Sequence, residues 1–237
     1  MKVWVVLRRE LIGHFLSPIA WVVAVMFAIA SAFFFEIHTL GRTVASLGSV
    51  YESTWWVFIV AFPALTMGTL AAEFRNGTIE TLATDPVRDG DIVLGKFFGV
   101  MAFFVVSLLP LLFFWGLLRW AGGNPDPGPL LSGLFGMLLA GGLCAAIGIF
   151  SSSITSNQTI AFGVAFLMLL VLRLSDIPQP IELPTWLRVT LDYIDLPAHL
   201  RGFYRGRIAL DDLIYFLSST ALFLFLSTRF LESRRWA

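Results

Sequence analysis

The chain has 237 residues, carries no net charge and is 57% hydrophobic, with charged residues making up only 14%. An ordinary soluble domain carries about 25% charged residues, so this chain has too few of them to cover a water-exposed surface. Several charge-free runs approach the roughly 20 apolar residues that cross a bilayer as a helix. These runs are continuous rather than alternating, which argues against a transmembrane β-barrel. The composition therefore predicts an all-α polytopic membrane protein, and the neutral charge does not suggest a nucleic-acid partner.

The N-terminal segment, residues 2–16, is predicted to be an amphipathic helix that lies in the membrane interface. One face of this helix carries apolar residues at helical spacing, namely Trp4, Leu7, Leu11 and Phe15. Ser17 and Pro18 end the helix before the first membrane span, because proline disrupts a helix interior. The alternative is that residues 2–16 extend the first span.

Six membrane spans are predicted from the apolar runs that polar or proline-containing segments separate. They cover residues 18–35, 54–72, 97–118, 130–154, 159–174 and 213–231. Because six crossings return the chain to its starting side, both termini are expected on one side of the membrane. The Lys and Arg residues of the short loops favour the cytoplasm for that side, since cytoplasmic loops are enriched in basic residues.

Small residues predict close helix packing in two of the spans. In the first span every fourth residue is alanine, and in the fourth span glycine and alanine recur. The predicted packing positions are Ala20, Ala24, Ala28, Ala32, Gly136 and Ala140. An alanine stripe also arises by chance in an alanine-rich span, so both interpretations of the first set stay open.

The segment before the last span, residues 175–212, combines several prolines with charged residues and short apolar clusters. It is predicted to form short interfacial or re-entrant helices on the extracytoplasmic side. Such backbone is tolerated at membrane depth only where protein or water covers it.

No group of residues predicts catalysis or metal binding. The single cysteine, Cys144, leaves no multi-cysteine metal site, and the histidines are scattered along the chain at His14, His38 and His199. The predicted span midplanes lack Asp, Glu and Lys, which argues against ion-coupled transport. Residues 90–96 are close to a phosphate-binding loop pattern, but Phe97 replaces the required Ser or Thr. The chain is therefore expected to bind no cofactor and to draw any energy from a partner.

One polar stretch with internal order, residues 73–96, separates the second and third spans. Gly77 can turn the chain out of the second span, and Thr78 suits the N-cap of a short helix. Pro86 stops this helix, because the residue before a proline avoids helical geometry. These features fit either a docking element for a cytoplasmic motor protein or an ordinary capped turn.

This loop resembles the cytoplasmic-loop signature of ATP-binding-cassette (ABC) type-2 permeases, the membrane subunits of bacterial ABC exporters. The residues that carry the resemblance are Glu73, Arg75, Gly77, Thr78, Glu80, Leu82, Pro86, Val87, Leu94, Gly95 and Lys96. The resemblance extends over nearly the whole chain, from the N-terminal helix through six spans to the broken segment before the sixth. The tail, at residues 211–216 and 231–236, is similar to the gliding-motility-associated subgroup of these permeases.

The resemblance implies that residues 78–84 form a coupling helix that seats in a groove on a separate ATPase subunit. The residues then predicted to serve coupling are Glu73, Arg75, Gly77, Thr78, Ile79, Glu80, Thr81, Leu82, Thr84 and Pro86. It also implies that residues 2–16 form a connector helix that touches the ATPase. The short helices before the last span would form an outer gate.

The implied function is the permease subunit of an ABC type-2 exporter in the cytoplasmic (inner) membrane. The chain would not be an enzyme, and its ATPase partner would bind ATP and magnesium. The other implied partners are a second permease chain, identical or different, membrane lipids, and an auxiliary protein in the periplasm. Two alternatives remain open, a scaffold that transmits force to a periplasmic partner without moving a solute and a membrane-embedded enzyme.

Overall fold

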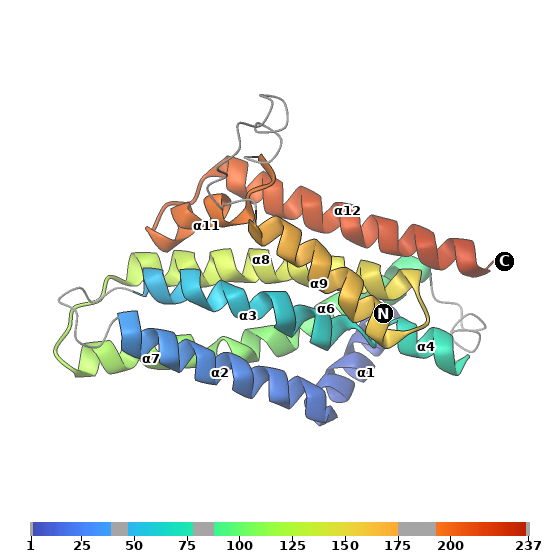
Figure 1. The fold of residues 1–237 in the computed structure, drawn as a ribbon, viewed down its shortest axis with the longest axis horizontal. Coiled ribbons are helices and arrows are strands. Elements are labelled where there is room, and N and C mark those ends of the chain that lie inside the picture. The colour runs from blue at the N-terminus through green and yellow to red at the C-terminus, as the bar shows by residue number, and fades with distance from the viewer. Residues whose placement is uncertain (1, 39–46, 78–87, 175–192, 236–237) are drawn as a thin grey trace.

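The computed structural model describes residues 2–38, 47–77, 88–174 and 193–235. Every regular element in these ranges is a helix, and the long helices lie side by side in one bundle (Figure 1). The elements are α1 (Lys2–Leu16), α2 (Pro18–His38), α3 (Gly48–Thr66), α4 (Ala71–Asn76), α6 (Asp89–Ser107), α7 (Leu109–Trp120), α8 (Pro127–Ile154), α9 (Gln158–Leu174), α11 (Leu196–Tyr204) and α12 (Leu210–Arg235).

Five helical stretches among the described residues are long and apolar enough to cross a membrane. They are Pro18–His38, Gly48–Asn76, Asp89–Trp120, Pro127–Ile154 and Leu210–Arg234. The chain is therefore an all-helical polytopic membrane protein over its described residues, as its composition predicts. The fifth predicted span corresponds to α9, whose 17 residues extend about 25 Å at about 1.5 Å per residue. This falls short of the roughly 30 Å hydrocarbon core of a bilayer.

Two of the predicted spans contain a break close to a proline. α3 passes through Pro63 and ends one turn later at Thr66, and a turn then leads to the short helix α4. The long stretch from α6 to α7 breaks at Leu108, and Pro110 lies in the first turn of α7. α6 begins at Asp89 rather than at the predicted residue 97, so Lys96 lies about two turns inside a helix.

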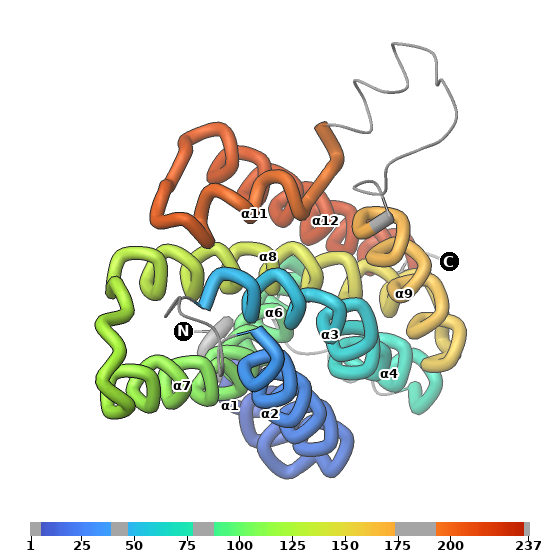
Figure 2. The backbone as a smooth tube through the Cα atoms, turned by 60° about the vertical axis from the view of Figure 1, so that its left-hand side comes forward, coloured from blue at the N-terminus to red at the C-terminus, as the bar shows by residue number. Residues whose placement is uncertain are grey.

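α8 is the central helix of the bundle. It lies between α11 and α12 on one side and α3 and α6 on the other (Figures 1 and 2). Its glycines receive bulky side chains from these neighbours, because a Cβ atom at Gly133, Gly136 or Gly141 would overlap an aromatic ring of α3, α11 or α6. The close packing of α8 therefore depends on glycine at these positions.

The small residues predicted to pack helices occupy different environments. Gly136 and Ala140 of α8 are buried, and so is Ala20 of α2, whereas Ala24 and Ala28 are half-buried and Ala32 is exposed. α2 instead packs through a row that includes larger side chains, namely Ala20, Val23, Phe27, Ser31 and Phe35. The alanine stripe thus lies mostly beside the contact that α2 makes within the chain.

Both described ends of the chain lie at one end of the bundle, together with α4 (Figure 1). Arg9 of α1 forms an ion pair with Glu73 of α4, and Arg234 near the end of α12 lies over the Phe74 ring of α4. We refer to this end as the α4 end. α11 packs against α8 and α3 at the opposite end.

Candidate functional site

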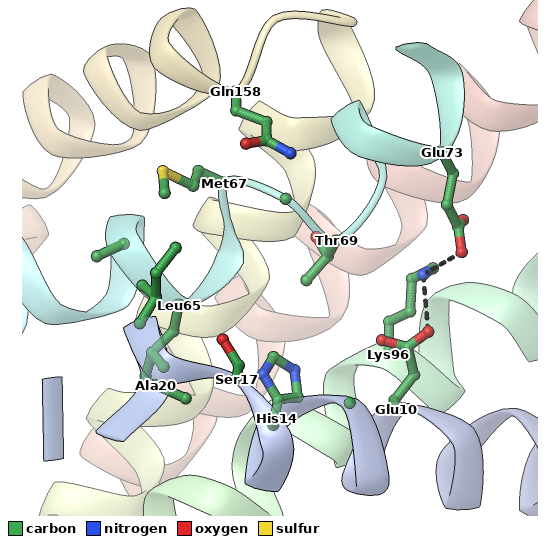
Figure 3. A pocket seen from close by; sticks show the side chains of 14 residues that line it. Glu10, His14, Ser17, Ala20, Leu65, Met67, Thr69, Glu73, Lys96 and Gln158 are labelled. Atoms are coloured by element: carbon green, nitrogen blue, oxygen red, sulfur yellow. Dashed lines mark hydrogen bonds and ion pairs between the residues drawn. The ribbon is translucent and has the colours of Figure 1, made fainter. Parts of the chain in front are cut away.

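A cluster of charged residues joins α1, α4 and α6 at the α4 end. The Lys96 side chain of α6 is only 1% exposed, and its Nζ lies 2.9 Å from Oε1 of Glu10 and 2.9 Å from Oε1 of Glu73 (Figure 3). Arg9 lies on the outer side of the cluster, with Nη2 2.7 Å from the same Glu73 oxygen. Arg9, Glu10, Glu73 and Lys96 are called the charged cluster below.

Two glycines of α6 allow α1 to approach closely enough to form this cluster. A Cβ atom at Gly95 would lie 2.6 Å from Cγ1 of Val6, and one at Gly99 would lie 2.7 Å from Cβ of Glu10. Gly95 and Gly99 are four residues apart and therefore lie on the same face of α6, as in other small-residue helix contacts. The contact brings Glu10 over the turn of α6 that carries Lys96.

Because Lys96 is buried, its ammonium group depends on its two carboxylate partners. An isolated ammonium buried in a protein costs several kcal/mol, and opposite charges with good geometry offset that cost. Burial by itself raises the pKa of the Glu10 carboxyl, but the charge and hydrogen bond of Lys96 outweigh it, so the pKa lies below its usual value. Glu10 is therefore ionised at neutral pH, and the two acids of the charged cluster balance its two bases.

A cavity of about 270 Å³ adjoins the charged cluster, and Figure 3 shows the side chains around it. His14, Ser17, Thr69 and Gln158 contribute polar groups, while residues of α2 and α3 supply an apolar wall. Nε2 of His14 is buried and makes no hydrogen bond within the described residues. Burial lowers the pKa of His14, and the Glu10 carboxylate offsets this only in part. The cavity is polar and large enough to hold several water molecules.

Protonation of the buried His14 imidazole in acid is expected to weaken the packing of α1. Since the pKa of His14 lies below its ordinary value of 6.5, its contribution to stability is complete above pH 6.5 and is lost as pH falls through the lowered value. The free energy of unfolding should fall by up to about 1.4 kcal/mol per pH unit in this window. Thermal unfolding from about pH 8 to about pH 5 should show this step in the wild type and not in His14→Gln. Identical pH profiles of unfolding for the wild type and His14→Gln would contradict this role of His14.

α4 carries the first of the residues predicted to serve coupling. Glu73 points into the charged cluster, whereas Arg75 is exposed in the last turn. Gly77 ends α4 with a φ of 68° and donates its N–H to the carbonyls of Glu73 and Phe74. This left-handed conformation favours glycine. The remaining predicted coupling residues lie outside the described residues, namely Thr78, Ile79, Glu80, Thr81, Leu82, Thr84 and Pro86.

α4 is also held by an apolar cluster beside the charged one. Its members come from the α3–α4 turn and from α6, α8 and α12, and are Leu70, Ile92, Val93, Ile149 and Leu231, with Phe74 packed against them. The Arg234 guanidinium lies 4.6 Å from the centroid of the Phe74 ring and donates a hydrogen bond to the Ile154 carbonyl. The six-residue helix α4 thus contacts both the N-terminal helix and the central part of the bundle.

The side of α1 that faces the bundle includes residues outside the predicted apolar row. Val6, Glu10 and His14 contact α6 or line the cavity. Of the predicted apolar residues, Leu7 and Leu11 are half-buried, and Phe15 is 36% exposed, with its ring centroid 5.4 Å from that of Phe103 of α6. The Trp4 side chain lies outside the described part. The ion pair between Glu10 and Lys96 had two signals in the sequence. Glu10 is the single acid of the N-terminal helix, and Lys96 lies at the edge of a charge-free run, where a charged residue is rarely buried unless it is paired.

A comparison with protein families matches residues 43–178, more than half of the chain, to the family described as ABC-2 family transporter protein. The matched part contains Glu73, Lys96 and the whole of α8, whereas α1, α2, α11 and α12 lie outside it. No curated protein matches the chain closely enough to count as a relative. Residues 90–96, close in pattern to a phosphate-binding loop, are helical and use Lys96 in ion pairs. The chain therefore belongs to the ABC-2 family of transporter proteins, in which it is a membrane-spanning permease component.

Proposed function

We propose that the chain is the permease subunit of an ABC type-2 exporter in the cytoplasmic membrane and that a separate ATPase subunit drives it. The charged cluster is the observation that carries this proposal. It ties α4, which leads directly into residues 78–87, to both α1 and α6 through Glu73. A force applied to residues 78–87 by a docked ATPase would therefore reach the N-terminal helix and the next span together.

The coupling step follows from the two attachments of α4. Residues 78–87 connect α4 to the start of α6, so a partner that moves them acts on both helices. The charged cluster makes α1 move with them, and the apolar cluster around Phe74 passes the movement to α8 and α12. Packed interfaces of this kind switch between discrete arrangements rather than deform continuously, which suits alternation between inward-open and outward-open states.

The topology and partners follow from the same proposal. α9, the fifth span along the chain, brings the number of spans to six, so both termini lie on one side of the membrane. The α4 end faces the cytoplasm, because it carries Arg8, Arg9, Arg75, Arg88, Arg229 and Arg234 and cytoplasmic loops are enriched in basic residues. A second permease chain and membrane lipids complete the transmembrane unit, and an auxiliary protein in the periplasm would act at the opposite end. α11, with the residues before it, supplies an outer gate. The tail sequence supports the gliding-motility-associated subgroup, and no observation on the described residues favours a force-transmitting scaffold.

Charge reversal at Arg75 tests the proposal. Arg75 is exposed in the last turn of α4, so Arg75→Glu should disturb docking without disturbing the fold. In a reconstituted complex with the co-purified ATPase, permease-stimulated ATP hydrolysis should fall about tenfold or more. The physical reason is that like charges facing each other across an interface cost several kcal/mol. The control is Arg207→Glu, an exposed arginine between α11 and α12, which should leave stimulation unchanged. Equal stimulation in both variants would refute docking at α4.

A further inference from the structure

Ser152 of α8 makes three hydrogen bonds to the bend between α3 and α4. Its Oγ accepts from the backbone N–H of Leu70 at 3.0 Å and of Ala71 at 2.9 Å, and its hydroxyl donates to the Met67 carbonyl at 3.1 Å. Ser152 is fully buried. A serine hydroxyl has one donor and two acceptor sites, so every hydrogen-bonding site of Ser152 is used on this bend.

α4 needs this contact because it lacks a cap of its own. The first N–H groups of a helix have no partner within the helix and are usually capped by a nearby Ser, Thr, Asp or Asn. The N-cap position of α4 is Leu70, which makes no side-chain capping bond. Ser152 supplies the missing acceptor from another helix, and the direction of α4 is therefore set against α8 rather than by its own sequence.

Gly148 extends the same contact by one helical turn. A Cβ atom at Gly148 would overlap the side chain of Thr66, the last residue of α3. Gly148 and Ser152 are four residues apart and lie on one face of α8. α8 thus contacts the end of α3 through Gly148 and the start of α4 through Ser152, so both sides of the bend are held against the central helix.

The serines on either side of Ser152 are equally buried but bond differently. The Ser151 hydroxyl donates to the Ile147 carbonyl and lies 3.8 Å from the Met168 sulfur, whereas Ser153 donates to the Phe150 carbonyl. These bonds to carbonyls stay within α8, and neither hydroxyl is among the hydrogen bonds described to the α3–α4 bend. The pattern separates the burial of a serine from the bridge to α4.

We propose that Ser152 is a positioning residue that fixes α4 to α8, so that a displacement of α4 moves α8 instead of being absorbed at the bend. This inference rests on the proposed coupling function of α4. Loss of the hydroxyl would leave two buried N–H groups and a carbonyl of the bend without that partner, and the bend would gain orientations that do not follow α8.

Ser152→Ala tests the inference, with Ser151→Ala and Ser153→Ala as matched controls. Ser152→Ala should lower permease-stimulated ATP hydrolysis by about tenfold, which is the size of change that loss of one helix cap makes in a conformational equilibrium. The controls should stay within about twofold of the wild type. Ser152→Thr keeps the hydroxyl and should retain most of the stimulation. Equal losses in the three alanine variants would show that serine burial alone matters and would overturn the proposal.

A distance measurement tests the position of α4 without the ATPase. Spin labels at the exposed positions Asn76 and Ser156, with the buried Cys144 replaced by Ala, report the separation of α4 from the end of α8. The distribution should broaden in Ser152→Ala and stay narrow in Ser151→Ala and Ser153→Ala. An unchanged distribution in Ser152→Ala would overturn the inference. A broadened distribution together with unaffected stimulation in Arg75→Glu would support the position of α4 and count against the coupling function instead.

Discussion

Replacing Lys96 with Met should lower the free energy of unfolding by about 3–5 kcal/mol, the usual cost of removing one partner from a buried ion pair. Methionine preserves much of the length and apolar stem of lysine, so the change isolates the charge. Glu10 and Glu73 would then face each other in a buried site, and the half-exposed Arg9 would be left to balance both. We expect α1 to separate from α6, which faster hydrogen exchange in residues 2–16 and unfolding in detergent would both detect.

A neutral version of the charged cluster is the control for this prediction. In the triple variant Lys96→Met, Glu10→Gln and Glu73→Gln no buried charge is left unpaired. Its free energy of unfolding should recover most of the loss, because replacing a whole buried ion pair with uncharged residues often leaves stability nearly unchanged. Its stimulation of the ATPase should stay low, since the ionic ties between α1, α4 and α6 are gone. A Lys96→Met single variant as stable as the wild type would contradict the role of the cluster.

Gly99→Leu should displace α1 by volume rather than by charge. A Cβ atom at Gly99 already lies 2.7 Å from Cβ of Glu10 and 3.7 Å from the Glu10 carbonyl carbon. The overlap is with the Cβ atom of Glu10, which is fixed to the backbone of α1 and cannot rotate away as the end of a flexible side chain could. Overpacking typically costs about 1–3 kcal/mol, and separation of Glu10 from Lys96 adds to it. We expect a total loss of at least about 3 kcal/mol in the free energy of unfolding.

Gly116→Leu on α7 is the matched control for Gly99→Leu. A Cβ atom at Gly116 has no neighbour within 4 Å in the described structure. Because leucine is a better helix former than glycine by up to about 1 kcal/mol, this variant should be as stable as the wild type or slightly more so. Similar unfolding free energies for the two variants would show that α1 does not rest on Gly99.

The two variants act on one contact by independent physical routes. Lys96→Met leaves the shape of the α1–α6 contact nearly unchanged and removes its charge balance, whereas Gly99→Leu leaves the charges and removes the space. If α1 moves with α4 as proposed, both should uncouple the ATPase. A variant that releases α1 yet keeps full ATPase stimulation would separate the N-terminal helix from coupling and leave α4 as the main route.

The class of the protein, an all-helical membrane protein, could be predicted from the sequence because it depends on local properties. Hydropathy and runs of apolar residues predict membrane helices whatever their neighbours are. Proline and glycine act on the backbone where they stand, and in the structure α1 ends at Leu16, before Pro18, and α4 ends at Gly77. The loop signature likewise pointed to the family that the match over residues 43–178 supports.

The charged cluster and the Ser152 bridge were decided only by the tertiary structure. The partners of Lys96 lie 86 and 23 residues away in the sequence, and Ser152 bonds to N–H groups 82 and 81 residues away. No local pattern specifies such pairs, since they require the close approach of α1 at Gly95 and Gly99 and of the end of α3 at Gly148. The apolar row of α1 could be read from its spacing, and Phe15 of that row contacts Phe103 of α6. The contacts of Val6 and Glu10 with α6 depend instead on the space at Gly95 and Gly99 and on the need of a buried lysine for carboxylate partners.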